Sequence, residues 1–383
     1  MDNNKDVLNI SIPADDLIWL ITEALGLEVE EGSFLFGRKK GNEVKTEGDR
    51  SEQYGGLIQD QTFLKVARSI AAPDYIVACR NGGGSLGLEE IRLHARKQEG
   101  AWIAAVSETT EGSCDIRVFE STNHFLDWWT DLFCGKNEEP AVNSIPPFVK
   151  LEEFLFLLHA VDSYRAVSYR NMLEHRYSSQ PSMEFTEFVN SMTESIKSKD
   201  IRWLLPAFLV LTPGLSEYPM ELTPEKAEIL MKLQFAGNLE QPEGGRSRLI
   251  FGEAGKNMGV EFYRSWLMAA GFEISVKDKG IFKATERLFV APTALSNHFV
   301  SVLKDEEGKA IVNHQAYTFE ELKVKLEALF DRASALAGTE ESVGAVPAAE
   351  TVSKAGGRAR FCASCGAPLE PAGAFCSSCG AKV

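Results

Sequence analysis

The sequence predicts an α+β fold in which one structural unit occurs twice, with a helical segment between the copies and a small module at the end. Three observations support this. Helical and strand periodicities follow one another in the same order in residues 10–134 and 219–332. Large apolar residues recur at a nearly constant separation. Of seven cysteines in the chain, four lie in its final residues, from Cys362 onward.

The first unit, residues 10–134, begins with an amphipathic helix whose apolar residues run at helical spacing from Leu17 to Leu25 and which Gly26 ends. The pattern next predicts a short strand at 33–37 (SFLFG) and a second helix at 63–70. An antiparallel β-meander and a closing helix follow. Its predicted strands are 75–79, 91–97, 101–107 and 115–120, and the helix is 124–133.

The second unit, residues 219–332, repeats this order. Its first helix starts at Thr223 and Pro224, an N-cap residue followed by a residue favoured at the first helical position. RLIFG at 248–252 is the counterpart of SFLFG, and a second helix is predicted at 260–271. The predicted strands are 272–276, 281–290, 298–305 and 309–317, with a closing helix at 319–330.

The spacing between corresponding residues supports an internal, pseudo-twofold duplication. Leu93 and Leu288 are 195 positions apart, as are Ile116 and Ile311. The pairs Trp102 with Phe299 and Phe133 with Phe330 are both separated by 197 positions. Such regularity favours duplication over chance matching of common α+β patterns.

Between the two units, residues 135–218 form a polar connector followed by a helical segment. Helices are predicted at 151–176, 183–196 and 202–211. After the second unit, residues 333–360 are rich in small residues and glutamate and lack an apolar period. We expect this stretch to be a disordered linker.

Composition restricts the classes of function. A net charge of −15 argues against nucleic-acid binding by the whole chain, because phosphate contacts need lysine and arginine. The N-terminal residues carry charges where a signal peptide needs an apolar run, and no apolar stretch is long enough to cross a bilayer. These features predict a cytoplasmic protein that does not insert into membranes.

The last module, residues 361–383, is too small to fold on apolar burial alone. It contains two Cys-x-x-Cys pairs, a spacing that lets both sulfurs of a pair reach one tetrahedral Zn²⁺. Metal binding would then supply the folding free energy. We therefore predict a structural zinc site, whose four ligands are Cys362, Cys365, Cys376 and Cys379.

This segment resembles the bacterial C-terminal zinc ribbon, whose pattern FCxxCGxxL…FCxxCG runs here from Phe361 to Gly380. The resemblance implies a module that docks on a protein or contacts nucleic acid. Residues 358–383 are only mildly basic, which favours docking on a protein over contact with nucleic acid. A redox dithiol is less well supported because the surrounding sequence lacks a βαβ pattern.

Other stretches resemble catalytic motifs without completing them. Residues 82–87 (GGGSLG) match a dinucleotide-binding loop, but strand periodicity follows where a helix is required, so a hairpin connection is predicted. Residues 252–259 (GEAGKNMG) resemble a phosphate loop but lack its first glycine and its hydroxyl, so a polar turn is predicted.

Isolated reactive side chains have simpler interpretations. His94 and His314 lie in alternating strand stretches, which places them most simply on solvent faces. Of Trp128 and Trp129, core packing accounts for at least one, and the other is a candidate contact anchor. The remaining cysteines, Cys79, Cys114 and Cys134, are expected to be buried and inert, although a Cys–His dyad stays open.

Residues 56–79 are similar to a stretch of the EspG-like chaperones of type VII (ESX) secretion, in which a leucine-bearing helix leads through an Ala-x-Pro-Asp-like turn into a strand. Here that turn is Ala71–Ala72–Pro73–Asp74. The resemblance implies a pseudo-twofold fold that binds a small helical-hairpin secretion substrate. The C-terminal cysteine module departs from the family pattern.

Three hypotheses follow. The first is a non-catalytic cytosolic adaptor or chaperone that binds a protein client through its body and docks elsewhere through its zinc ribbon. The second is a regulatory protein whose ribbon contacts nucleic acid. The third is an enzyme whose site is assembled from residues that are distant in sequence.

Overall fold

A computed structural model provides the structure of the chain. It describes residues 8–38, 47–82, 88–100, 102–139, 145–176, 182–198, 200, 203–215, 224–233, 235–240, 245–261, 269–293, 295–337, 360–361 and 368–369. The chain divides into two units, Met1–Ala348 and Ala349–Val383. The larger unit combines helices with a large antiparallel sheet, in agreement with the predicted α+β class.

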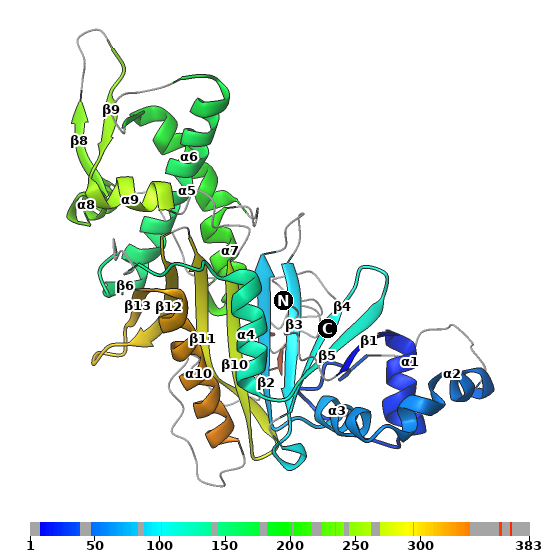
Figure 1. Cartoon of the computed structure of the whole chain (residues 1–383). Coiled ribbons are helices and arrows are strands. Elements are labelled where there is room, and N and C mark those ends of the chain that lie inside the picture. Colours follow the sequence, from blue (N-terminus) through cyan, green and yellow to red (C-terminus); the bar gives the residue numbers. More distant parts are fainter. Residues whose placement is uncertain are drawn as a thin grey trace. The chain divides into compact units, whose positions relative to one another are not determined.

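The large sheet has ten strands in the order β1-β5-β4-β3-β2-β10-β11-β12-β13-β6 (Figure 1). Every neighbouring pair is antiparallel. The strands on one side are β1 (Leu8–Pro13), β2 (Tyr75–Gly82), β3 (Leu88–Ala95), β4 (Ile103–Glu108) and β5 (Ser113–Phe119). Those on the other side are β6 (Phe148–Lys150), β10 (Ala270–Asp278), β11 (Ile281–Pro292), β12 (Asn297–Lys304) and β13 (Ala310–Tyr317).

The sheet contains both predicted meanders, which meet at its centre. The ladder between β2 and β10 runs from Tyr75 opposite Val276 to Asn81 opposite Ala270. On each side, a meander of four strands is followed by one helix, α4 (Thr122–Phe133) or α10 (Phe319–Leu336). The two predicted units therefore share one sheet.

Helices α4 and α10 pack next to each other on one face of the sheet (Figure 1). Trp129 of α4 and Phe330 of α10 are fully buried in the same apolar cluster as Val77 of β2 and Phe272 of β10. The ring centroids of Trp129 and Phe272 are 4.7 Å apart. This cluster spans the junction between the meanders, so the two halves also share a core.

The opposite face of the sheet is covered by two separate groups of helices. Over the N-terminal strands lie α1 (Ala14–Trp19), the π-helical turn η1 (Leu20–Ala24) and α3 (Gln61–Ala71), whose apolar residues pack on β4 and β5. Over the C-terminal strands lie α5 (Leu151–Leu173) and α7 (Leu204–Leu211), which pack on β11, β12 and β13. The middle of the sheet is thus buried on both faces.

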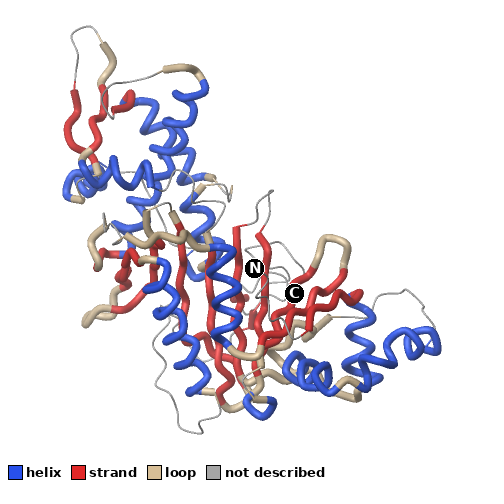
Figure 2. The backbone as a smooth tube through the Cα atoms, viewed as in Figure 1, coloured by secondary structure: helices blue, strands red, loops and turns tan. Residues whose placement is uncertain are grey.

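The segment between the meanders forms a helical lobe with a three-stranded sheet (Figure 2). In the lobe, α5 packs against α6, α8 and α9, and the small sheet has the order β7-β9-β8. Its helices are α6 (Phe185–Lys197), α8 (Pro224–Lys232) and α9 (Glu253–Glu261). Its strands are β7 (Ser182–Glu184), β8 (Ala236–Glu240) and β9 (Arg248–Phe251).

The predicted strand at 33–37 is wrong, because SFLFG forms consecutive turns. Gly32 and Gly37, which flank it, have φ values of 92° and 74°, a left-handed region that interrupts an extended strand. The backbone N–H of Phe34 donates to Nε2 of His94 at 3.0 Å instead of to a neighbouring strand. Its proposed counterpart at 248–252 contains β9, so the two segments do not correspond.

Other differences concern the ends of the units. The polar turn predicted at 252–259 is wrong, because these residues begin helix α9. Most of the helix predicted at 260–271 lies outside the described residues. The helix α2 (Glu47–Gln59) and the edge strand β1 were not predicted. By contrast, β2 and β3 pair as the hairpin expected around residues 82–87.

In the smaller unit, the structure describes two short strands, β14 (Arg360–Phe361) and β15 (Pro368–Leu369), which pair antiparallel. The four predicted zinc ligands lie outside the described residues, as do residues 338–359 of the linker predicted at 333–360. The start of that linker is wrong, because residues 333–336 continue helix α10.

Asp162 joins three helices of the lobe and is fully buried. Its carboxylate accepts hydrogen bonds from the N–H groups of Leu204 and Leu205 at 2.6 and 2.8 Å, which caps the start of α7. It also accepts from Nη1 of Arg165 at 3.0 Å. One side chain therefore satisfies a helix terminus and a buried cation together.

Asp162→Ala is expected to lower the free energy of unfolding by about 3–5 kcal/mol, because it removes the carboxylate partner of a buried arginine and uncaps α7. Urea denaturation followed by circular dichroism measures the change. Glu194→Ala, at an exposed position on α6, is the control and should change stability by less than about 0.5 kcal/mol. Equal stability of the two variants would contradict this assignment.

Candidate functional site

The described cysteines have the inert character that the sequence predicts. Cys79 and Cys114 are buried and Cys134 is partly buried. Burial raises the pKa of all three thiols, to about 11 for Cys114 and higher for the other two. Since the thiolate is the nucleophile, these residues are poor candidates for covalent catalysis at neutral pH.

The placement of His94 and His314 on solvent faces is wrong, because both side chains are fully buried. His94 accepts the hydrogen bond from Phe34 described above. Nε2 of His314 lies 2.8 Å from Nδ1 of His298, whose own Nε2 lies 2.7 Å from Oε1 of Glu261. His94 thus anchors the turn at 33–37 and His314 contacts His298, whereas the Nδ1 atoms of His94 and His314 have no hydrogen-bond partner among the described residues.

A second buried polar group contains His159, Ser195 and Asp162. Nδ1 of His159 is 3.0 Å from Oγ of Ser195, which donates to Oδ2 of Asp162 at 3.4 Å. A catalytic triad needs the histidine between serine and carboxylate, and here the serine is in the middle. None of the three is more than 4% exposed, and burial lowers the pKa of His159 to about 3. The arrangement supports packing of α5 on α6.

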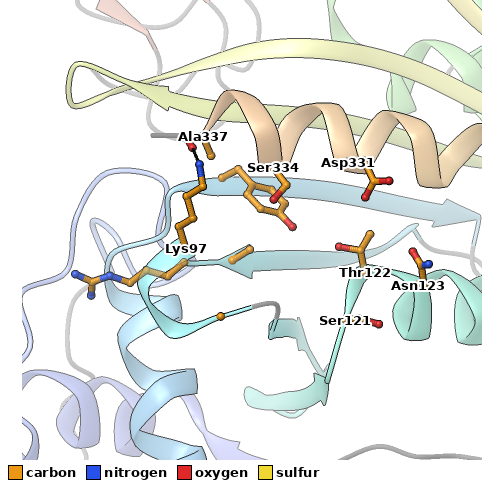
Figure 3. A pocket seen from close by; sticks show the side chains of 11 residues that line it. Lys97, Ser121, Thr122, Asn123, Asp331, Ser334 and Ala337 are labelled. Carbon is orange, nitrogen blue, oxygen red and sulfur yellow. Dashed lines mark hydrogen bonds between the residues drawn. The ribbon is translucent and has the colours of Figure 1, made fainter. Parts of the chain in front are cut away.

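Among the described residues, no group of three or more histidine, cysteine, aspartate or glutamate side chains is arranged to hold a metal ion. A cavity of about 300 Å³ lies where the start of α4 meets the end of α10 (Figure 3). In it, Nζ of Lys97 donates to the carbonyl oxygen of Ala337 at 2.6 Å, which satisfies a carbonyl at the end of α10. This cation therefore has a structural partner.

A groove of about 620 Å³ lies beside α4, and we call it the α4 groove. Its wall is the outer side of α4, with Trp128, Leu132 and Phe133. Its floor is the uncovered part of the sheet face, where Ile91 of β3 and Ala105 of β4 lie. Leu132 on this wall is 53% exposed.

Trp128 is held in place by its neighbours. Its ring centroid lies 5.5 Å from that of Phe119 and 6.0 Å from that of Phe125. The guanidinium of Arg117 lies over it, 4.6 Å from the ring centroid. The prediction that core packing accounts for one of the two tryptophans is confirmed, because Trp129 is fully buried, while Trp128 is partly exposed at the groove.

Carboxylates surround the apolar part of the α4 groove. Glu90 is bonded to both Arg80 and Arg92 at 2.8 Å, and these cations hold its pKa below the usual value despite burial, which acts in the opposite direction. Glu89 and Asp115 have no ion-pair partner among the described residues. Arg117 also lines the groove, so its border combines four carboxylates with one cation and is acidic overall.

Comparison with known proteins identifies no relative: no protein-family model matches the chain, and no curated protein matches it. Within the described part of the chain, no helix combines the length and hydrophobicity that a membrane span requires.

The buried state of His94 makes stability depend on pH. Because burial lowers its pKa to about 3, the folded state stays neutral while an unfolded histidine takes up a proton below about pH 6.5. The unfolded state then binds more protons, so stability falls as pH falls through this range. Between pH 7 and pH 5, the wild type should lose about 2 kcal/mol more than His94→Gln.

Urea titrations of both proteins at pH 7 and pH 5 provide this comparison. Glutamine keeps an acceptor for the N–H of Phe34, so the variant should remain folded. The same pH dependence in both proteins would show that His94 is accessible to protons in the folded state.

Proposed function

We propose that this chain is a non-catalytic protein-binding adaptor or chaperone whose client binds in the α4 groove. The observation that carries the proposal is the exposed apolar wall of that groove, formed by Trp128 and Leu132, beside a carboxylate border. Protein interfaces commonly place an aromatic anchor in an apolar centre with polar groups around it.

The chemistry of the described residues supports binding over catalysis. The thiols and the His159–Ser195–Asp162 group are withdrawn from solvent, and the α4 groove contains neither a histidine nor a cysteine. Its acidic border also disfavours a nucleic acid at this surface, because phosphates would be repelled. Under the resemblance to EspG-like chaperones, the client is a small helical-hairpin secretion substrate.

The paired meanders have the arrangement that an internal duplication would produce, and we include the duplication in this proposal. Leu93 of β3 and Leu288 of β11 both lie in the apolar cluster shared by α4 and α10. In the same way, Phe133 and Phe330 are on the corresponding helices.

The proposed client contact can be tested by affinity capture with the full chain, followed by quantitative mass spectrometry. Leu132→Asp should reduce recovery of the client at least tenfold, because it places a carboxylate in the apolar wall beside existing carboxylates. Val324→Asp is the matched control, since Val324 is 63% exposed on α10 and does not line the groove. Recovery that is equal for both variants would contradict the proposal.

The proposal also includes a structural zinc ribbon at residues 361–383, supported by the spacing of its two cysteine pairs. The purified chain should contain one zinc ion, measured by atomic absorption and by release with a chromogenic chelator. Cys376→Ser should lose this ion, whereas Cys79→Ser, at a buried position in β2, should retain it. Retention of zinc by Cys376→Ser would contradict the assignment of the ligands.

A further inference from the structure

Strand β1 has one edge to which no described strand is paired. The N–H of Ala14 donates to the oxygen of Gly112 at 3.1 Å, so Ala14 is a hydrogen-bonded position. In the β1–β5 register, residues 8, 10 and 12 precede it at steps of two and are also hydrogen-bonded to β5. Hydrogen-bonded positions alternate in antiparallel pairs. The N–H and C=O groups of Asn9 and Ser11 therefore point away from β5.

Within the described part of the chain, this edge lacks the features that usually protect an exposed strand. Proteins block such edges with charged residues, bulges, prolines or covering elements. Strand β1 reads LNISIP, has no charged residue and pairs with β5 without a register shift. Only Pro13 at its end interrupts the row of donors. The other edge strand, β6, has three residues and continues directly into α5.

The two faces of β1 differ in chemistry. Leu8 and Ile10 are half-buried against the cluster of α1 and α3. Asn9 and Ser11 are exposed on the opposite face, where Asn9 lines the α4 groove. Side chains of an added strand would alternate in the same way, one set extending the apolar face and the other entering the groove.

Charge identifies the occupant of this edge. Ser11 is directly opposite Asp115, which is exposed, and Asn9 is opposite Arg117; both charged residues line the groove, where the carboxylates of Glu89, Glu90, Glu108 and Asp115 outnumber this one cation. A residue added beside Ser11 would be two strand spacings from Asp115, about 10 Å, a distance that a lysine or arginine side chain can bridge. A second copy of this chain is disfavoured, because it would bring two acidic grooves together on molecules of net charge −15.

We infer that an extended segment of a partner protein, with alternating apolar and basic residues, adds to the free edge of β1 as a further strand. Main-chain hydrogen bonds to Asn9 and Ser11 provide affinity, and the acidic groove selects basic side chains. The inference rests on the proposed function, since it makes the α4 groove part of a protein-binding surface.

A direct test uses a fluorescein-labelled eight-residue peptide of alternating valine and lysine, with binding to the full chain followed by anisotropy. Ser11→Pro removes an outward-facing N–H that β5 does not use, and proline is tolerated on edge strands. Ser11→Ala removes only the hydroxyl and is the matched control. The wild type and Ser11→Ala should bind equally, and Ser11→Pro at least tenfold more weakly.

Two further measurements do not depend on how Ser11→Pro folds. The first measures binding of two altered peptides to the wild-type chain. A peptide whose backbone nitrogens facing β1 are methylated should not bind, and a peptide with glutamate in place of lysine should not bind either. Amide hydrogen exchange should show new protection at Asn9 and Ser11 when the unmodified peptide is bound.

Other outcomes separate the inference from the proposed function. If the lysine peptide does not bind the wild type, or binds Ser11→Pro and Ser11→Ala equally, the inference is overturned. If the peptide binds Ser11→Pro normally but fails to bind Leu132→Asp, the groove binds protein without strand addition and the proposed function stands. Dimerisation of the wild type that Ser11→Pro abolishes, seen by sedimentation, would assign the edge to a second copy and overturn the inference.

Discussion

The ladder between β2 and β10 is the contact on which the larger unit depends. It converts two four-stranded meanders into one sheet and aligns Val77 of one meander with Ile274 of the other, both fully buried. Helices α4 and α10 then pack across the junction on a shared apolar surface. Without this ladder, each meander would expose an edge and half of an apolar face to water.

Burying the sheet on two faces makes the polar residues within its strands costly unless they are satisfied. Two of these residues use one polar atom each to bind a neighbouring element, while Nδ2 of Asn81 and Nδ1 of His94 have no hydrogen-bond partner among the described residues. Oδ1 of Asn81 in β2 accepts from Nε1 of Trp129 in α4 at 3.1 Å, and His94 in β3 accepts from the turn at Phe34. The buried polar residues thus hold helices and turns in register against the sheet.

Most strands and helices of the meanders could be predicted because their periodicity records which faces are buried. In β4, for example, Ile103 and Ala105 face the α4 layer while Ala104 and Val106 face the α1–α3 layer, and both layers are apolar. The failures occur where a distant partner decides the outcome. SFLFG has the composition of a strand, but its backbone bonds to His94, sixty residues away in the chain. No local pattern contains that information.

The α4 groove could not be predicted for a related reason: it exists because of the order of the strands. Two helices, each about 10 Å across, cover roughly four or five strands spaced 4.8 Å apart. A ten-stranded sheet is wider than that, so strands far from the β2–β10 junction stay uncovered on the face that carries α4 and α10. The sequence indicates which side chains are apolar. That Trp128 and Leu132 line a groove follows instead from the strand order, which places β5 and β1 beyond α4. The α4 groove is thus a consequence of joining two meanders through a central ladder and covering them with one helix each.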